Sequence, residues 1–468
     1  MSNDGRPPRQ PDRRSGGTGV VPQERGDELA AWAASGAMFL TGRPDGPPLP
    51  APDGFVGRLR AVGAVLARRS AELGRPVDVD VLALLGERAA LADLHRGGDA
   101  SCGGAARLLP TADGWLAVNL TRSEDVELLP AWLAGLPFSV PPAARDPERI
   151  TDRNGGRSAR RSSTEVWKAV GDAVAAAAAQ PLVERAQLLG LPVAALPWRP
   201  PAVPPAAEPL QGLPVIATAF GHGLAGAALD GLLVADLSSL WAGPLCSHLL
   251  QLAGARVVKV ESVHRPDGAR FGPPAFFDLL HAGQQAVALD FRVDDGRAAL
   301  RRLLRSADVV VEGSRPRALE QLGIRAEEIL AEAAEAGAGP GIWVSITGSG
   351  RIGPGRDRVA FGDDAAVAGG LVARDAGGPC FLADAVADPC AGLVAASAVL
   401  SALAAGRRRL LDVPMAAVAA HLAGHGPQAA AIPAPEGLTV EAPRARPVTG
   451  GAPALGEHTE AVLAEVGG

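Results

Sequence analysis

The chain has 468 residues, 47% of them hydrophobic, and a formal net charge of −6. This length suggests several domains of roughly 100–200 residues each, with sizeable buried cores. An acidic chain without a long basic stripe is not expected to bind nucleic acid, and its alanine-rich stretches are shorter than the ~20 apolar residues that a membrane span requires. The short basic runs 157–161 and 407–409 are expected to be solvated faces.

The four cysteines form no CxxC pair and lack the spacing of zinc ligands, so the sequence predicts neither a metal site nor a disulfide framework. A reducing cytoplasm is the simplest setting for such a chain. Residues 1–28 are polar and lack the apolar stretch of roughly 7–15 residues that a signal peptide needs. We therefore expect a disordered tail over residues 1–28.

The first half of the chain predicts a mixture of helices and a hairpin. Helices are expected over residues 56–69 and 164–179, and a β-hairpin over residues 108–120 with its turn at Ala112-Asp113-Gly114. A proline-rich segment, residues 196–214, favours extended backbone and divides the chain into two halves. We expect a helical segment over 29–94, a small α+β domain over 95–195, and a linker over 196–229.

The second half alternates short apolar runs with helical patterns. Strands are predicted over residues 232–237, 256–260, 286–291, 308–312 and 341–346, and helices over 244–252 and 296–304. Such alternation indicates parallel strands joined by right-handed crossovers. The predicted fold class is therefore α/β, with an open, parallel, Rossmann-like sheet and flanking helices over 230–346, a further segment over 347–468, and the smaller α+β domain.

A weak internal repeat joins the two halves. Residues 34–66 echo residues 368–400: both have small residues around a glycine, then a Gly/Pro turn, then a helix that ends in Ala-Val-Leu. Val65 pairs with Val399, so the offset is 399 − 65 = 334 residues. Chance similarity is the alternative in a chain so rich in alanine and glycine.

A dinucleotide site is the first functional hypothesis to consider. Glu261 ends the second predicted strand, where an acidic residue would bind a ribose. However, the turn over residues 237–244 contains no GxGxxG, and Trp241 would obstruct the approach of a pyrophosphate. The residues alone thus predict an α/β enzyme with an unidentified ligand.

Six segments of the second half, in order, resemble signatures of the family III CoA-transferases (the CaiB/BaiF family). The first reads LVADLSSLWAGPLCSHLLQLAGARVVKVE, and the fifth, ADPCAG, places Asp388 on the family's catalytic aspartate. The segments are 233–261, 281–291, 307–323, 345–358, 387–392 and 456–459. The first half resembles the family in shifted order, as a truncated first copy that supplies the small domain. The fold is thus expected to be permuted.

The resemblance implies covalent catalysis by Asp388, which would attack a thioester to give an aspartyl anhydride and then an aspartyl-CoA thioester. Asp388 must then be ionised, and a position at a helix start would support an anion. The alternative is that Asp388 only caps that helix. By the repeat offset, Gly54 stands where Asp388 should have a counterpart, with Asp53 beside it, so we expect one working carboxylate.

Coenzyme A is implied as a co-substrate, with no permanently bound cofactor. A glycine-rich loop could fold over the intermediate and exclude water, although an ordinary flexible connection is the alternative. The expected CoA contacts are Ser239, Leu240, Trp241, Ala242, Leu289, Gly313 and Ser314, and the loop glycines are Gly97, Gly98, Gly103 and Gly104.

The chain departs from the family at several CoA-binding positions. Gln284-Gln285 stands where the family commonly has Lys-Arg, and Ser262 stands where a basic residue often occurs. Loss of these cations weakens phosphate contacts. Four arginines elsewhere are possible substitutes: Arg265, Arg270, Arg315 and Arg356.

The resemblance implies an acyl-CoA and a carboxylic acid as partners, and a homodimer. Two alternatives stay open. The first is a 2-methylacyl-CoA racemase of the same fold, which would pair the aspartate with a histidine; residues 360–364 (AFGDD) contain none. The second is a non-catalytic CoA-binding paralogue, which the altered contacts and the rearranged halves would suit.

Overall fold

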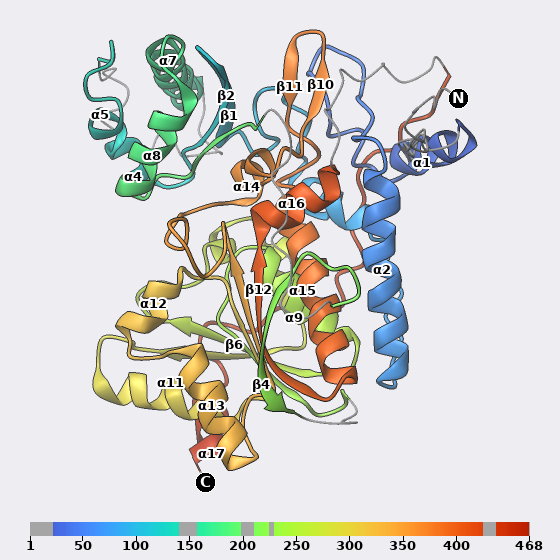
Figure 1. Cartoon of the computed structure of the whole chain (residues 1–468), viewed down its shortest axis with the longest axis vertical. Coiled ribbons are helices and arrows are strands. Elements are labelled where there is room, and N and C mark those ends of the chain that lie inside the picture. The colour runs from blue at the N-terminus through green and yellow to red at the C-terminus, as the bar shows by residue number, and fades with distance from the viewer. Residues whose placement is uncertain (1–21, 140–156, 198–209, 224–228, 425–436, 468) are drawn as a thin grey trace, which may run out of the picture.

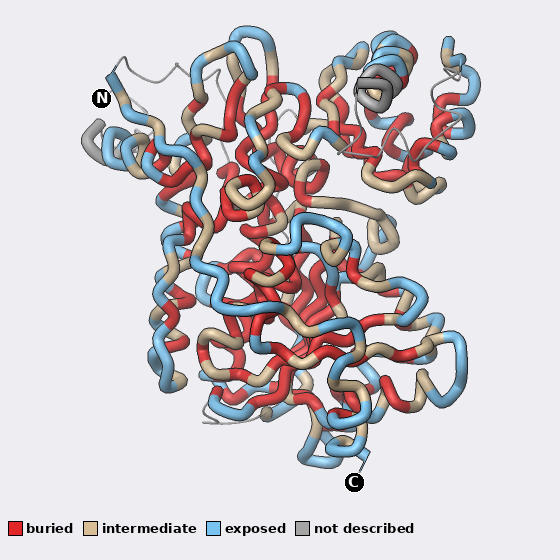
Figure 2. The backbone as a smooth tube through the Cα atoms, turned by 180° about the vertical axis from the view of Figure 1, so that it is seen from behind, coloured by how far each residue is buried: buried red, intermediate tan, exposed pale blue. Residues whose placement is uncertain are grey.

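The structure is a computed structural model that describes residues 22–139, 157–197, 210–223, 229–424 and 437–467. A large sheet with helices on both faces forms the lower body in Figure 1, and a smaller sheet with its own helices lies above it at one side. Buried residues concentrate in the middle of the large body and along the inner side of the small one (Figure 2).

Seven strands form the large sheet, in the order β4-β12-β9-β8-β5-β6-β7. All neighbouring strands are parallel except β4, which is antiparallel to β12 at the edge. The predicted open and mostly parallel α/β sheet is thus confirmed. Its strands are β4 (Ile216–His222), β5 (Leu233–Asp236), β6 (Arg256–Ser262), β7 (Gln285–Leu289), β8 (Val309–Glu312), β9 (Ile342–Thr347) and β12 (Arg407–Pro414).

Helices cover both faces of this sheet because its central strands carry apolar side chains on both faces. Alternate residues of β8 point to opposite faces: Val309 and Val311 join one core, and Val310 joins the other. The first core includes α9 (Ala242–Leu252), α10 (Pro274–His281) and α15 (Ala387–Ala404). The second includes α11 (Asp294–Ser306), α12 (Pro316–Gln321), α13 (Ala326–Ala336) and α17 (Thr459–Gly467).

The smaller body contains the predicted hairpin. Strands β1 (Ala106–Thr111) and β2 (Gly114–Asn119) pair so that Ala112 and Asp113 form the turn, and β3 (Val193–Ala195) pairs with β2. The helices that the structure describes around this sheet are α4 (Ser123–Glu127), α5 (Leu129–Trp132), α7 (Arg157–Val174) and α8 (Ala179–Leu189). They enclose a separate core around Trp132, whose indole N–H donates to the carbonyl of Leu182 at 2.9 Å.

The remaining elements complete the fold around the two sheets. From the first half these are α1 (Pro22–Ala34), α2 (Phe55–Glu72), η1 (Ala83–Gly86) and α3 (Glu87–Ala92). From the second half they are η3 (Gly268–Phe271), α14 (Gly362–Ala368), β10 (Ala373–Asp375), β11 (Gly378–Cys380) and α16 (Met415–Ala423). The two helices of the predicted repeat, α2 and α15, pack against each other along their length (Figure 1).

Three expectations need correction. Strand β4 comes from residues 196–229, which were expected to be a linker, and α1 begins at Pro22, inside the range expected to be disordered. The basic run that opens β12 is solvated only at Arg407, because Arg408 and Arg409 are 3% and 6% exposed. Arg408 donates to the carbonyls of Gly339 and Pro340, so its charge is held by backbone oxygens that follow α13.

Within the described residues, α15 is the one helix whose length and composition would allow it to cross a membrane. It lies inside the protein instead: 89% of its 18-residue window is buried, and it packs against α2, α9 and β12. A core helix of this kind satisfies the same length and hydropathy criteria, so this finding is weak evidence for a membrane span.

A buried ion network holds the loop that follows β5. Lys259 is 1% exposed, and its ammonium lies 2.9 Å from Asp267 and 3.8 Å from Asp236. It also donates to the carbonyl of Ser238, within the loop itself. Burial alone would lower the pKa of Lys259, but the two carboxylates outweigh it and raise that pKa. The lysine therefore remains charged beneath the loop that leads into α9.

Replacing Lys259 should destabilise the protein strongly. Lys259→Met leaves two buried carboxylates without their cation, so we expect the free energy of unfolding at pH 7 to fall by about 3–5 kcal/mol in urea titrations. Lys168, the other lysine of the chain, forms an exposed pair with Asp172. Lys168→Met is the matched control and should change the free energy by less than about 1 kcal/mol. Equal effects of the two substitutions would contradict the structural role of Lys259.

Candidate active site

Asp388 is the second residue of α15 and is half-buried. The N-cap position of α15 is Val386, and no side chain caps this end. The hypothesis that Asp388 serves only as the helix cap is therefore wrong. Its backbone N–H donates to the carbonyl of Ala385 at 2.9 Å, and the described structure contains no hydrogen bond to its carboxylate. The carboxylate is thus partly exposed and free of hydrogen bonds to the described residues, so it can act as a nucleophile.

A second helix begins directly against this carboxylate. A Cβ atom added to Gly362, the first residue of α14, would lie 2.6 Å from Asp388 Oδ2 and 2.3 Å from the carbonyl oxygen of Ala385. Only glycine fits there without a shift of the backbone. The amino ends of α14 and α15 thus meet at Asp388, and helix amino ends favour negative charge.

Four aspartates gather at this junction, which we call the carboxylate cluster: Asp363, Asp364, Asp384 and Asp388. Arg88 acts on Asp363, Asp384 and Asp388, and Arg358 acts on Asp364. Arg88, from α3, donates to both carboxylate oxygens of the fully buried Asp384, with 2.8 Å between Nε and Oδ2. Its guanidinium also lies 5.4 Å from the centroid of the Trp241 ring. A residue from the first half of the chain therefore completes the site.

The electrostatics of the cluster raise the pKa of Asp388 to about 7. Burial is the largest cause; Arg88 opposes it, and the other three aspartates add to it. The pKa of Asp364 is raised to about 6, again chiefly by burial, although the backbone N–H of Phe361 and the amide of Asn119 donate to it. Asp388 was expected to stay ionised; at neutral pH about half of it is.

The glycine-rich loop lies against the segment that leads to Asp388. The carbonyl of Gly98, a residue with φ of +69°, accepts the backbone N–H of Phe381 at 2.9 Å, and the thiol of Cys102 donates to the carbonyl of Ala383 at 3.3 Å. Gly97 forms an isolated bridge with Ala100, which leaves no space for a side chain there. Gly103 and Gly104 continue this loop toward β1. Its closure over an intermediate stays a prediction.

The residues expected to contact CoA lie at the carboxyl ends of the strands, in different surroundings. Ser239 and Leu240 follow β5 at the surface, and Leu240 has φ of +72° and is 37% exposed. Trp241 is 2% exposed and lies edge-on to Phe276. The Arg88 guanidinium lies over its ring. Ala242 packs against α15.

The remaining predicted contacts follow neighbouring strands. Gly313 and Ser314 follow β8, and a Cβ atom on Gly313 would lie 3.4 Å from the side chain of Ser238, so the loops after β5 and β8 are neighbours. Leu289 ends β7 and is 5% exposed within the core beside α11. Trp241 and Ala242 thus adjoin the carboxylate cluster, whereas the side chain of Leu289 faces the core.

The sequence reasoning missed Arg88, Asp363, Asp364 and Asp384. Asp384 and Asp388 are four residues apart, and Asp363-Asp364 occupy the segment that was searched only for a histidine. Those spacings were available signals. Arg88 carries no local signal, because its partner Asp384 is 296 residues away.

At Gly54, where the repeat offset places the counterpart of Asp388, the neighbouring side chain is that of Arg58. Gly54, the N-cap of α2, has φ of +73°, and a Cβ atom there would lie 2.7 Å from the guanidinium of Arg58. Arg58 also donates to the carbonyls of Asp53 and Leu422. The Arg58 side chain thus occupies the space at the start of α2. Asp53 forms an exposed ion pair with Arg25.

The chain is similar to members of one protein family. The family model described as CoA-transferase family III matches residues 229–459. The succinyl-CoA–D-citramalate CoA-transferase of Chloroflexus aurantiacus is 33% identical over 151 residues, which are 31% of this chain and 36% of that protein. The succinate–glutarate CoA-transferase of Agrobacterium fabrum is 30% identical over 218 residues, which are 41% of this chain and 53% of that protein.

A solved structure of a CAIB/BAIF family protein from Brucella suis is 31% identical to this chain. The match covers 41% of this chain and 54% of that chain, with a TM-score of 0.37. The chain thus spans between 36% and 54% of the length of these three relatives.

Because the pKa of Asp388 is raised, ionisation of this group should lower the free energy of unfolding as the pH rises. Between the ordinary aspartate pKa and about 7, the folded state holds a proton that the unfolded state has lost, so this group makes stability fall as the pH rises. Asp388→Asn removes the cost, so it should raise the free energy of unfolding at pH 8 by about 1–3 kcal/mol but change it little at pH 4.5.

Urea titrations of both proteins at the two pH values measure this difference. Asp53→Asn, at the exposed aspartate beside Gly54, is the control and should show no difference between pH 4.5 and pH 8. If Asp388→Asn destabilised the protein equally at both pH values, the electrostatic account of the cluster would be wrong.

Proposed function

Because residues 229–459 of this chain belong to CoA-transferase family III, we propose that the chain is an enzyme that moves CoA from an acyl-CoA to a carboxylic acid, with Asp388 as the nucleophile. The observation that carries the proposal is the Asp388 carboxylate itself. It is accessible, it has no hydrogen-bond partner among the described residues, and two helix amino ends point at it. Three further aspartates lie close enough to raise its pKa, and the nearby Arg88 opposes them.

The proposed reaction proceeds through three covalent intermediates, namely two mixed anhydrides and the aspartyl-CoA thioester between them. The Asp388 carboxylate attacks the thioester carbonyl, the C–S bond breaks, and a mixed anhydride and the CoA thiolate form. The thiolate attacks the Asp388 carbonyl carbon and releases the donor acid, which leaves an aspartyl-CoA thioester. The acceptor carboxylate then attacks this thioester, and the thiolate that is released attacks the acceptor's carbonyl to give the new acyl-CoA and free Asp388. No water or oxidant is consumed.

The surroundings of Asp388 suit this chemistry. The developing oxyanions lie at the amino ends of α14 and α15 and near the Arg88 guanidinium, which favour negative charge. A pKa of about 7 leaves a usable ionised fraction at neutral pH while it makes the carboxylate more basic than an ordinary aspartate. The loop containing Gly98 and Cys102 would exclude water from the anhydride.

A second reaction is favoured by one observation. Asp363 is half-buried and contributes to the raised pKa of Asp388, so two titratable groups adjoin although no histidine is present in the segment 360–364. Such a pair could exchange the α-proton of an acyl-CoA. Deuterium incorporation at the α-carbon in D₂O, without any acceptor acid, would favour this racemase-like reaction over CoA transfer.

Trapping of the covalent intermediate tests the transferase. Incubation with succinyl-CoA and hydroxylamine should convert Asp388 to a hydroxamate, detectable by peptide mass spectrometry, because both the anhydride and the aspartyl thioester react with this nucleophile. Asp388→Asn should abolish the modification and the transfer, and Asp53→Asn should leave both intact. Persistent absence of the hydroxamate with succinyl-, acetyl- and branched acyl-CoAs would favour a non-catalytic CoA-binding protein.

A further inference from the structure

The internal repeat continues into the structure at an unchanged offset. Helices α1 and α14 end at Ala34 and Ala368, and 368 − 34 is again 334. Two residues later, Gly36 and Gly370 have φ of +83° and +77°, so each segment leaves its helix through a left-handed turn that favours glycine. Similar composition alone does not align helix ends in this way, so the two segments share a local fold.

A further match follows α2 and α15. Residues 75–79 (RPVDV) align with residues 409–413 (RLLDV) at the same offset, and three of the five positions are identical. Residues 409–413 belong to β12 of the large sheet, whereas residues 75–79 form no strand. We call residues 34–90 the first repeat and residues 368–424 the second repeat. The first repeat has kept its helices and lost the strand that would need a sheet beside it.

Equivalent positions of the two repeats touch each other. The offset pairs Arg43 with Gly377, and a Cβ atom on Gly377 would lie 2.9 Å from the Arg43 guanidinium. The offset also pairs Gly63 with Ser397, whose hydroxyl donates to the carbonyl of Val62, the residue before Gly63, at 3.4 Å. Positions can meet their own equivalents only near a two-fold axis, so such an axis runs between α2 and α15.

Other contacts across this axis are exchanged between the repeats. Arg88 corresponds to Leu422, and each reaches the start of the other repeat's long helix. The carbonyl of Leu422 accepts the Arg58 guanidinium at the start of α2, and Arg88 acts on Asp388 at the start of α15. Likewise α16, which lies at the offset of η1, packs against α2, and η1 packs against α15. Reciprocal contacts of this kind characterise a two-fold, isologous interface.

The apolar character of α15 explains why this interface must be filled. All its residues except Asp388 and Ala404 are buried, and a helix that is apolar all round needs cover on every side. It packs against α9, β12 and α2, and the α2 residues in the shared core include Leu59, Val62 and Leu66. Without α2, the side of α15 that it covers would expose apolar surface to water.

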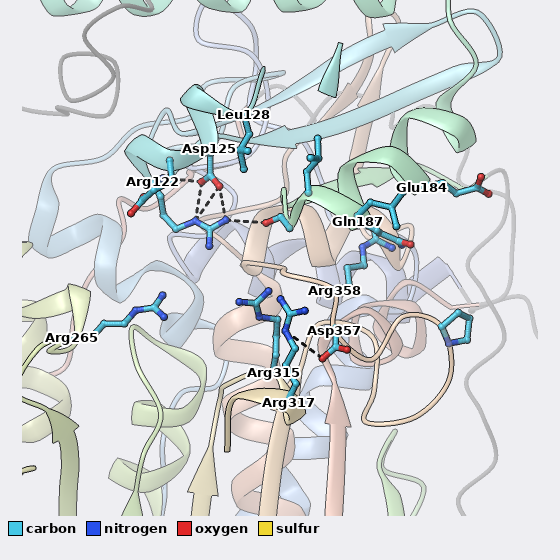
Figure 3. A pocket seen from close by; sticks show the side chains of 15 residues that line it. Arg122, Asp125, Leu128, Glu184, Gln187, Arg265, Arg315, Arg317, Asp357 and Arg358 are labelled. Carbon is cyan, nitrogen blue, oxygen red and sulfur yellow. Dashed lines mark hydrogen bonds and ion pairs between the residues drawn. The ribbon is translucent and has the colours of Figure 1, made fainter. Parts of the chain in front are cut away.

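The small body, which follows the first repeat along the chain, also meets the second half. A cleft of about 710 Å³ lies between this body and the carboxyl ends of the large sheet (Figure 3). Arg122 lines it from the first half, and Arg315 and Asp357 line it from the second. The nearby Arg358 guanidinium donates to the carbonyl of Val193 in β3. The two halves of one chain therefore also line a common space.

We infer that the first repeat occupies, within one chain, the place that a second copy of the second repeat would take. The side of α15 around the two-fold axis is an interface for a second copy of itself, and α2 fills it. One chain then supplies both Arg88 and Asp388, so the active site needs no residue from a partner chain; this step rests on the proposed function. Of the two equivalent sites, only one keeps a carboxylate, because Gly54 stands at the other and Arg58 occupies its space.

Cross-linking tests this arrangement without reference to activity. The background is Cys102→Ser, because Cys102 is the one native cysteine that is not buried. Arg43→Cys with Gly377→Cys should react with a short bismaleimide to give an internally linked chain of monomer mass, at a yield independent of protein concentration. Arg43→Cys with Ser306→Cys is the matched control and should give no internal link, since Ser306 is exposed at the end of α11, across the sheet from α15.

Denaturing gels and peptide mass spectrometry separate the outcomes. A covalent dimer as the main product of the Arg43 and Gly377 pair would show that the contact joins two chains, and it would overturn the inference. Two singly labelled cysteines without a link would overturn it as well, because the two positions would then lie apart.

Co-expression provides a second measure, which uses the Asp388 hydroxamate. Arg88→Ala and Asp388→Asn chains, each first shown to fold by circular dichroism, should together form no more hydroxamate than Arg88→Ala alone, because neither chain carries a complete site. Recovery of labelling on the Arg88→Ala chain would overturn the inference, since Arg88 of one chain would then serve Asp388 of another. If the wild-type chain formed no hydroxamate, the proposed function would fail, and the cross-link would still decide this inference.

Discussion

The bidentate pair between Arg88 and Asp384 is the contact on which the rest of this site depends. Four aspartates meet where α14 and α15 begin, and buried carboxylates without a cation are strongly unfavourable. Arg88 supplies that cation from α3, 296 residues away along the chain. It also lies over Trp241, so the same guanidinium joins the first half, the segment before α15 and the loop after β5. The same contact therefore positions the first half of the chain and offsets part of the negative charge of the carboxylate cluster.

The cluster remains electrostatically unfavourable even with this arginine. The pKa of Asp388 stays near 7. The close approach of Gly362 leaves no room for a side chain between the start of α14 and the carboxylate. A sequence optimised for stability alone would replace such a group by an amide or an apolar residue. Its persistence at the junction of two helix amino ends is the physical argument for a chemical role. The Lys259 network beneath the neighbouring loop differs, because there two buried carboxylates share a fully buried ammonium.

Most of the large sheet could be predicted from local patterns. Strands β5 to β9 are short apolar runs between helical segments, and such runs form buried parallel strands. Strand β12 was missed because its arginines looked like a solvated face, although backbone carbonyls of a distant loop bind Arg408. Strand β4 was missed because it follows a proline-rich stretch and has only one neighbour, β12. Both strands depend on partners that no local window contains.

The sequence by itself determined the fold class, through the alternation of strand and helix, and it nominated Asp388 through an ordered set of family-like segments. It could not determine what surrounds Asp388. Arg88, Asp384 and Gly362 approach it from three separate segments, and the pKa of a buried carboxyl depends on distances to such neighbours rather than on its own segment. Only the tertiary structure decided that Arg88 pairs with Asp384 beside Asp388, and that α14 begins directly against the Asp388 carboxylate.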